Sequence, residues 1–165
     1  GHLGGLGIHW LDLPMYLTGS DVVEVAGFAG NVGGQPIDVE DSAALSLRYA
    51  NGSFGTLTSG YYLDRGYHSH IRIWGSGGWL EYTEWLGGRQ EAPLKWQSTV
   101  EPKTDGIQEY KGPFEPRGYT PFVVECVRAC AGLREAPITG RDGLRALKII
   151  HGFYEAAEQG RTVKI

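Results

Sequence analysis

Residues 42–63 read SAALSLRYANGSFGTLTSGYYL and carry the clearest structural signal in the chain. Apolar residues alternate imperfectly over 42–50, and a second strand-like run covers 54–63. Asn51-Gly52 lies between the two runs, and this dipeptide is a strong signal for a tight hairpin turn. The stretch therefore predicts two adjacent antiparallel strands.

The hairpin is one part of a longer series of strand-like segments. Further strands are expected at residues 22–32, 68–75, 79–85, 94–100 and 162–165. Residues 101–118 are polar and rich in Pro and Gly, so we expect a long loop there, and loops of this length are often functional.

Three helices are expected around the strands. The first covers residues 8–17, although Pro14 weakens its helical pattern. The second covers residues 120–131, because Thr120 followed by Pro121 is a favourable helix start. Its expected buried face comprises Phe122, Val123, Cys126, Val127 and Cys130.

The third helix is expected to begin at residues 139–142, whose sequence TGRD has capping-box spacing, and to end at Gly160. Its expected buried face comprises Leu144, Leu147, Ile150, Tyr154 and Ala157.

This order of elements predicts an α+β fold over residues 1–165, taken as a single domain. We expect a large, mostly antiparallel sheet with the helices packed on one face. The other face then needs cover, so we expect a homo-oligomer, a dimer or a tetramer, formed through the open sheet face. The chain also opens abruptly, with glycines running straight into a helix, and we expect an upstream segment in the natural protein.

Composition excludes several classes of protein. The 165 residues are 41% hydrophobic and 21% charged, which is typical of a globular domain. The formal net charge is −4 and no basic stripe is visible, so we expect no nucleic-acid partner. No apolar run reaches the roughly 20 residues that span a bilayer, and no signal peptide is visible. The cysteines Cys126 and Cys130 suit one helix face rather than a disulfide framework, so a reducing cytoplasm is expected.

The candidate chemistry lies in the first residues. His9 is expected at a helix start, where free N–H groups favour a neutral imidazole that can accept a proton. Asp12 follows one turn later, placed to orient the ring or its neighbours. The alternative is that His9 caps the helix or packs against Trp10. From these residues alone, the structural role is the stronger interpretation.

A family resemblance changes that balance. Residues 4–19, GGLGIHWLDLPMYLTG, resemble the pattern that opens the C-terminal domain of the Gfo/Idh/MocA oxidoreductases. That pattern is a glycine-rich lead followed by Asp-x-Gly-x-His-x-x-Asp, and it is matched here by Gly7, His9 and Asp12. Further resemblances follow in the family's order at residues 41–43, 49–55, 71–78, 137–144 and 154–163.

The resemblance implies a function for the chain. Family members bind NAD or NADP in an N-terminal Rossmann domain, which is absent from this chain, and their C-terminal domain contributes to a sugar or polyol site. It implies proton transfer by His9, usually with an Asp four residues earlier, where this chain has Gly5. Three functions stay open: a dehydrogenase of this type, an NAD-dependent glycosidase of the same fold, or a non-catalytic binding or assembly module.

Other residues are weighed as substrate or metal ligands. The resemblance places a substrate-contacting loop at residues 61–70, which makes Tyr62, Arg65 and His68 candidates, and Arg117 and Tyr119 end the long loop. His68 and His70 alternate on one strand but lack a third ligand, so no metal site is expected. Residues 5–7 follow no strand and are not a dinucleotide fingerprint, so no cofactor-binding residue is expected in this chain.

Overall fold

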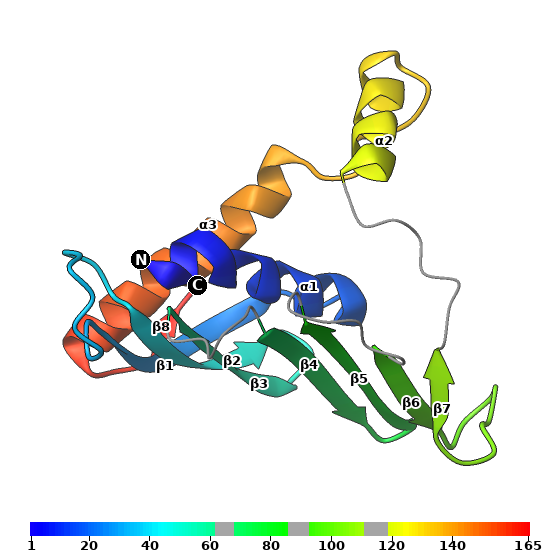
Figure 1. Ribbon diagram of the computed structural model, residues 1–165, viewed down its shortest axis with the longest axis horizontal. Helices are drawn as coiled ribbons and strands as arrows, with labels where there is room; N and C mark the ends of the chain where they lie inside the picture. Colours follow the sequence, from blue (N-terminus) through cyan, green and yellow to red (C-terminus); the bar gives the residue numbers. More distant parts are fainter. Residues whose placement is uncertain (62–67, 86–92, 111–118) are drawn as a thin grey trace. The chain divides into compact units, whose positions relative to one another are not determined.

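The computed structural model describes residues 1–61, 68–85, 93–110 and 119–165 (Figure 1). The chain divides into two compact units. The first unit contains Gly1–Tyr62 and Thr120–Ile165, and the second contains Leu63–Tyr119. Each unit is built around its own antiparallel sheet.

The sheet of the first unit has four strands in the order β3-β2-β1-β8. Their bounds are Val22–Gly30 for β1, Ser42–Tyr49 for β2, Phe54–Gly60 for β3 and Val163–Lys164 for β8. The hairpin between β2 and β3 is confirmed. Gly52 has a positive φ of 87°, and the Asn51 side chain accepts a hydrogen bond from the Ser53 amide at 3.0 Å.

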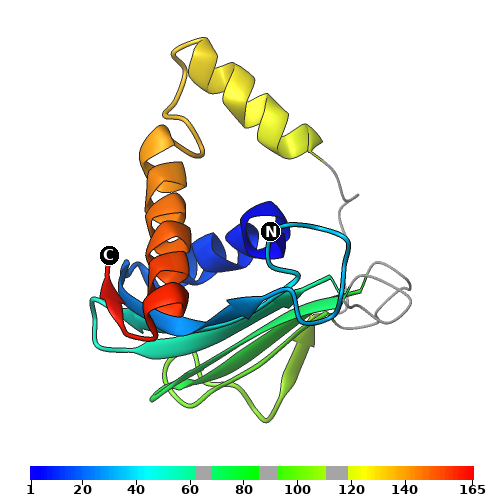
Figure 2. The same ribbon diagram turned by 90° about the vertical axis from the view of Figure 1, so that its left-hand side faces the viewer.

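The helices are η1 (Leu3–Gly7), α1 (Ile8–Thr18), α2 (Thr120–Cys130) and α3 (Gly140–Gln159). Helical backbone begins earlier than expected, because the π-helix η1 runs directly into α1. Pro14 is accommodated inside α1. Figure 2 shows α1 and α3 on the same face of the first sheet. The core lies between these two helices and the sheet, and it includes Leu11, Met15, Val25, Leu45, Leu47, Ile149, Ile150 and Phe153.

The start of α3 confirms the expected capping box, but its buried face differs from the expected one. Thr139 and Asp142 form the reciprocal pair of hydrogen bonds, which lowers the pKa of Asp142. The buried residues of α3 are Ala146, Ile149, Ile150, Phe153 and Ala156, whereas Leu144 and Leu147 are exposed and Tyr154 is half-buried.

A close fit between α3 and β1 explains this correction. A Cβ atom on Gly27 would lie 3.0 Å from Phe153 Cε2 and 2.0 Å from the carbonyl oxygen of Ala44. The fully buried Phe153 ring therefore occupies space that exists because residue 27 is glycine. Helical periodicity within α3 does not contain this information.

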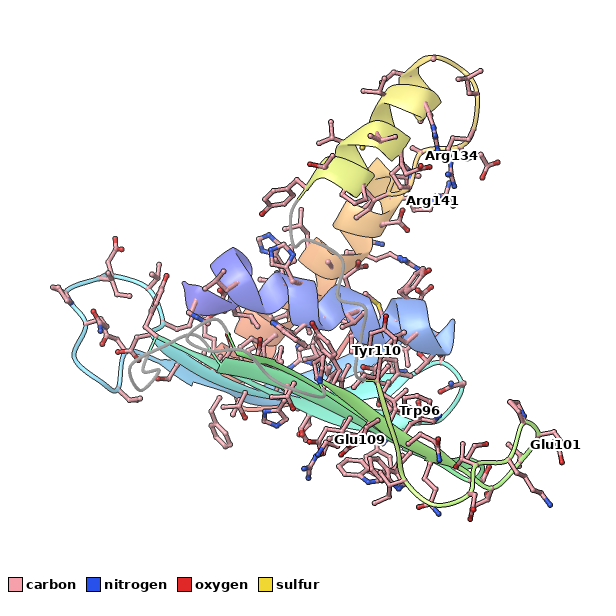
Figure 3. All side chains as sticks on the ribbon, turned by 45° about the vertical axis from the view of Figure 1, so that its right-hand side comes forward. Trp96, Glu101, Glu109, Tyr110, Arg134 and Arg141 are labelled. Atoms are coloured by element: carbon pink, nitrogen blue, oxygen red, sulfur yellow. The ribbon has the colours of Figure 1, made fainter. Side chains whose placement is uncertain are left out.

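The expected buried face of α2 is wrong in this structure. No residue of α2 is buried among the described residues, and Val127 on the expected face is exposed. Cys126 is half-buried, Cys130 is exposed, and both are free thiols. Arg134, labelled in Figure 3, forms an ion pair with Glu125 of α2. The amphipathic pattern is real, but no described segment packs over it.

The sheet of the second unit has four strands in the order β4-β5-β6-β7. Their bounds are His68–Gly75, Gly78–Trp85, Leu94–Ser98 and Gln108–Tyr110. β7 falls inside the expected long loop and was not predicted, because three residues are too few to show alternation. It carries Glu109, labelled in Figure 3, whose carboxylate pairs with Lys95 of β6 at 3.2 Å.

The α+β class and the antiparallel pairing are confirmed, with the strands divided between two four-stranded sheets. In the described ranges no helix has the length and apolar character needed to cross a membrane.

Candidate functional site

The candidate site lies on the outer face of the continuous helix formed by η1 and α1. Helical spacing places Gly5, His9 and Tyr16 on the face opposite Leu11 and Met15. Gly5, His9 and Tyr16 are exposed, while Leu11 and Met15 are buried in the core. This arrangement turns the His9 imidazole away from the sheet and toward any molecule that approaches α1.

His9 does not lie at a helix start, which corrects the expectation from sequence. The helical backbone begins at Leu3, and the Gly5 amide donates to the Gly1 carbonyl at 3.1 Å. Free backbone N–H groups influence the charge of a nearby side chain only within the first turn of a helix. His9 lies beyond that turn, so this influence does not reach it.

His9 and Asp12 are both available to a ligand. Across the described part of the chain, neither the His9 ring nor the Asp12 carboxylate forms a hydrogen bond within the protein. Asp12 is half-buried, one turn after His9 on the same side of α1. Beside them, a Cβ atom added to Gly5 would meet nothing within 4 Å, so the space four residues before His9 is open.

The π-helix η1 packs tightly against β3. A Cβ atom on Gly7 would lie 2.9 Å from Ser59 Oγ and 2.8 Å from Leu3 Cδ1, so only glycine allows this approach. Ser59 Oγ lies 2.6 Å from His2 Nδ1, and the His2 ring stands edge-on to Tyr61 with centroids 4.6 Å apart. Burial lowers the pKa of His2, and the Glu40 carboxylate opposes this in part.

Glu40 connects η1 to α3. Its Oε1 accepts hydrogen bonds from the Leu3 amide at 3.1 Å and from the Tyr154 hydroxyl at 3.0 Å. Its backbone carbonyl accepts from the His2 amide at 3.3 Å, and its Oε2 lies 3.4 Å from the Gly1 nitrogen. Burial and the Glu40 carboxylate raise the pKa of Tyr154 to about 12.

The neighbouring carboxylate, Asp41, serves a different segment. It is fully buried and accepts hydrogen bonds from the backbone amides of Val32 and Gly33, at 3.1 and 3.0 Å, and from the Ser42 hydroxyl at 2.9 Å. Asp41 therefore fixes the loop that follows β1. Sequence reasoning missed the roles of His2 and Glu40, because an acidic pair before a strand does not show which carboxylate will be buried or what it will bind.

The remaining candidates are distributed between the units. Tyr62, Arg65 and Arg117 lie outside the described residues. His68 begins β4 of the second unit, and Tyr119 is exposed just before α2. Within the described ranges no group of three or more His, Cys, Asp or Glu residues could hold a metal ion.

The face of the first sheet that α1 and α3 leave open carries two exposed aromatic rings. Phe28 is 82% exposed and Phe54 is 84% exposed. In the same cross-strand row as Phe54, Arg48 and Glu24 form an ion pair at 2.8 Å, beside a shallow hollow of about 220 Å³, while Phe28 lies further along β1. This face is separated from His9 by the sheet itself.

Comparison with known proteins gives one sequence match and many structural ones. Residues 1–81 match the GFO/IDH/MocA C-terminal domain. A search of curated proteins gave no match.

Among similar solved structures, the aldose-aldose oxidoreductase from Caulobacter crescentus, complexed with glycerol, is 25% identical, with a TM-score of 0.82 over 100% of this chain and 48% of that chain. An oxidoreductase domain protein from Kribbella flavida is 22% identical, with a TM-score of 0.83 over 100% of this chain and 50% of that one. The WlbA dehydrogenase from Bordetella pertussis, in complex with NADH and UDP-GlcNAcA, is 20% identical, with a TM-score of 0.75 over 100% of this chain and 45% of that chain.

The chain thus spans about half the length of these three proteins. The sequence match over residues 1–81 and the shared fold over the rest agree with each other. The chain is therefore similar to the Gfo/Idh/MocA oxidoreductases: residues 1–81 match their C-terminal domain, and the whole chain shares a fold with the oxidoreductases above.

Proposed function

We propose that this chain supplies the substrate side of an NAD- or NADP-dependent oxidoreductase that acts on a sugar, a polyol or a related hydroxy compound, with His9 in proton transfer. The observation that carries the proposal is the state of His9. It is exposed, forms no hydrogen bond within the described protein, and stands on a helix whose first turn is fixed by Gly7 and Glu40. A histidine that only caps or packs would be expected to have protein partners.

The cofactor is assigned to another part of the protein. Among the described residues, no strand passes through a glycine-rich turn directly into a helix, which is the unit that holds a dinucleotide pyrophosphate. The described residues therefore do not fit NAD or NADP by themselves. We propose that an N-terminal Rossmann domain binds the nucleotide, as the NADH complex of the WlbA dehydrogenase supports for a protein of the same fold.

The residues of this chain act on the substrate. In oxidation of a hydroxyl group, the His9 imidazole would accept the hydroxyl proton while the carbon gives up its hydride to the oxidised nicotinamide bound elsewhere in the protein. In reduction, an imidazolium would return the proton. Asp12, one turn further, accepts a hydrogen bond from a neighbouring hydroxyl and so helps to orient the ring of a sugar. The open space at Gly5 admits a water molecule or a substrate group beside His9.

We also propose that the protein is a homo-oligomer, a dimer or a tetramer, formed through the open face of the first sheet. Phe28 and Phe54 are large apolar side chains that stand almost fully in solvent on that face. Large exposed aromatic rings on an open sheet face are typical of a surface that another subunit covers.

The direct test is a screen of the complete protein against sugars and polyols with NAD and with NADP. The readout is the formation of the reduced nicotinamide. A substrate that turns over supports the dehydrogenase. Cleavage of a glycoside without net reduction of the cofactor would indicate the NAD-dependent glycosidase. Binding of a sugar without either reaction would indicate the non-catalytic module, which the absence of a carboxylate at Gly5 favours.

A further inference from the structure

We propose that Glu40 and Tyr154 are positioning residues for the reaction: together they hold the π-helix η1 in place and so fix the direction in which His9 points. The inference rests on the proposed function of His9. It assigns a role to a buried carboxylate and a hydroxyl that do not themselves reach the outer face of α1.

The contacts converge on one carboxylate from distant parts of the chain. Glu40 is 8% exposed, and its Oε1 accepts from Leu3, which is 37 residues away, and from Tyr154, which is 114 residues away. Leu3 is the first residue of η1, and Tyr154 lies in the C-terminal half of α3. A single oxygen atom therefore joins the start of the candidate site to the long helix that packs on the sheet.

The segment that Glu40 holds is weak on its own. Three of the five residues of η1 are glycine, and glycine loses the most conformational freedom when it becomes helical. The π-helical hydrogen-bonding pattern is itself rare, and η1 has no side-chain N-cap. Contacts with the rest of the protein must therefore hold η1 in its helical conformation. Glu40 makes one such contact, a hydrogen bond with the first residue of η1.

Loss of this contact should loosen η1 more than the rest of the fold. The core between α1, α3 and the sheet is large and does not depend on the Tyr154 hydroxyl, so its protection against unfolding is retained. A displacement of about 1 Å in a catalytic group can reduce turnover by up to roughly a hundredfold. The effect of removing the hydroxyl should thus appear in turnover before it appears in global stability.

The chain offers a matched control. Tyr154→Phe removes a hydroxyl that donates to the carboxylate of Glu40, and Ser42→Ala removes one that donates to the carboxylate of Asp41. Asp41 fixes the loop after β1 through the amides of Val32 and Gly33. Each change deletes one hydroxyl donor to a buried carboxylate, but the carboxylate that Tyr154 contacts is the one that accepts from Leu3 of η1.

The experiment compares parent, Tyr154→Phe, Ser42→Ala and His9→Ala in the complete protein, by amide hydrogen exchange and by steady-state kinetics with a substrate that turns over. In Tyr154→Phe we expect faster exchange across residues 3–9 and a kcat lowered by roughly tenfold to a hundredfold, with an unchanged KM for the nucleotide. In Ser42→Ala we expect the parental exchange across residues 3–9 and a kcat within about twofold of the parent.

Unchanged exchange across residues 3–9 in Tyr154→Phe would overturn the role of Glu40 in holding η1. Faster exchange with an unchanged kcat would overturn the positioning role, provided that His9→Ala is inactive. If His9→Ala is itself fully active, the proposed role of His9 has failed instead, and the two failures are thereby distinguished.

Discussion

Ser59 of β3 and His2 are joined by a hydrogen bond of 2.6 Å, and the backbone of Gly7 packs directly against the same serine. One side chain thus contacts both the residue that precedes η1 and the last residue of η1.

Stability should fall as the pH is lowered below about 6.5, the ordinary pKa of histidine. Because burial lowers the pKa of His2 in the fold, the unfolded chain binds a proton more readily than the folded one. The contribution of His2 is therefore fully present above the unfolded pKa and is lost as the pH decreases from there through the lower pKa of the folded state. Thermal unfolding of parent and His2→Asn between neutral and acidic pH measures this, and we expect a shallower acid decline in the variant. Parallel declines would show that His2 is not the titrating group.

Gly7→Ala should destabilise the protein, whereas Gly5→Ala should not. The added methyl at residue 7 would meet Ser59 Oγ at 2.9 Å and Leu3 Cδ1 at 2.8 Å, and overpacking of this kind costs about 1–3 kcal/mol. At Gly5 the methyl meets nothing within 4 Å, and alanine favours a helix over glycine by roughly 0.5–1 kcal/mol. Chemical denaturation of both variants measures the difference. Equal decreases in the free energy of unfolding for the two variants would mean that η1 does not pack on β3 as described.

Phe153→Ala should destabilise the fold by about 3–5 kcal/mol, because the ring is fully buried between α3 and β1. Leu147→Ala, on the face that periodicity alone favours, should cost much less because Leu147 is 46% exposed. Urea unfolding of the two variants compares the two faces of α3 directly. A larger loss at Leu147 would show that another partner covers that side of the helix.

Replacing Phe28 and Phe54 together by serine should convert the protein to a monomer. Both rings stand on the open face of the first sheet, and the proposed subunit contact would lose its largest apolar area. Phe122→Ser on α2, which also removes an exposed ring, is the control that should leave assembly unchanged. Sedimentation at micromolar concentration distinguishes these outcomes. A parent protein that is already monomeric there would contradict the assembly proposal.

Local chemistry made several elements predictable from sequence. The Asn51-Gly52 turn and the capping box of Thr139 and Asp142 act through backbone groups only one to three residues away, and both occur as expected. The positions of most strands followed in the same way from alternation and from turn residues.

Tertiary contacts made other features unpredictable. The side of α3 that faces the core packs into the space left by Gly27. The Leu3 amide, at the beginning of η1, donates to Glu40, which lies 37 residues away. The family resemblance directed attention to His9, but its position inside a helix rather than at a helix start became visible only in the structure.

We propose that His9 moves the proton, and turnover of His9→Ala in the complete protein distinguishes this role from a packing role. We predict a kcat lowered by roughly 10²–10⁴-fold, with partial recovery on addition of imidazole, because the exposed position leaves room for the free base. Nucleotide affinity and thermal stability should remain at the parental values, and Tyr16→Ala, on the same exposed face of α1, should keep most of the activity. A His9→Ala variant with nearly full turnover would contradict the claim and would move the proton transfer to another residue.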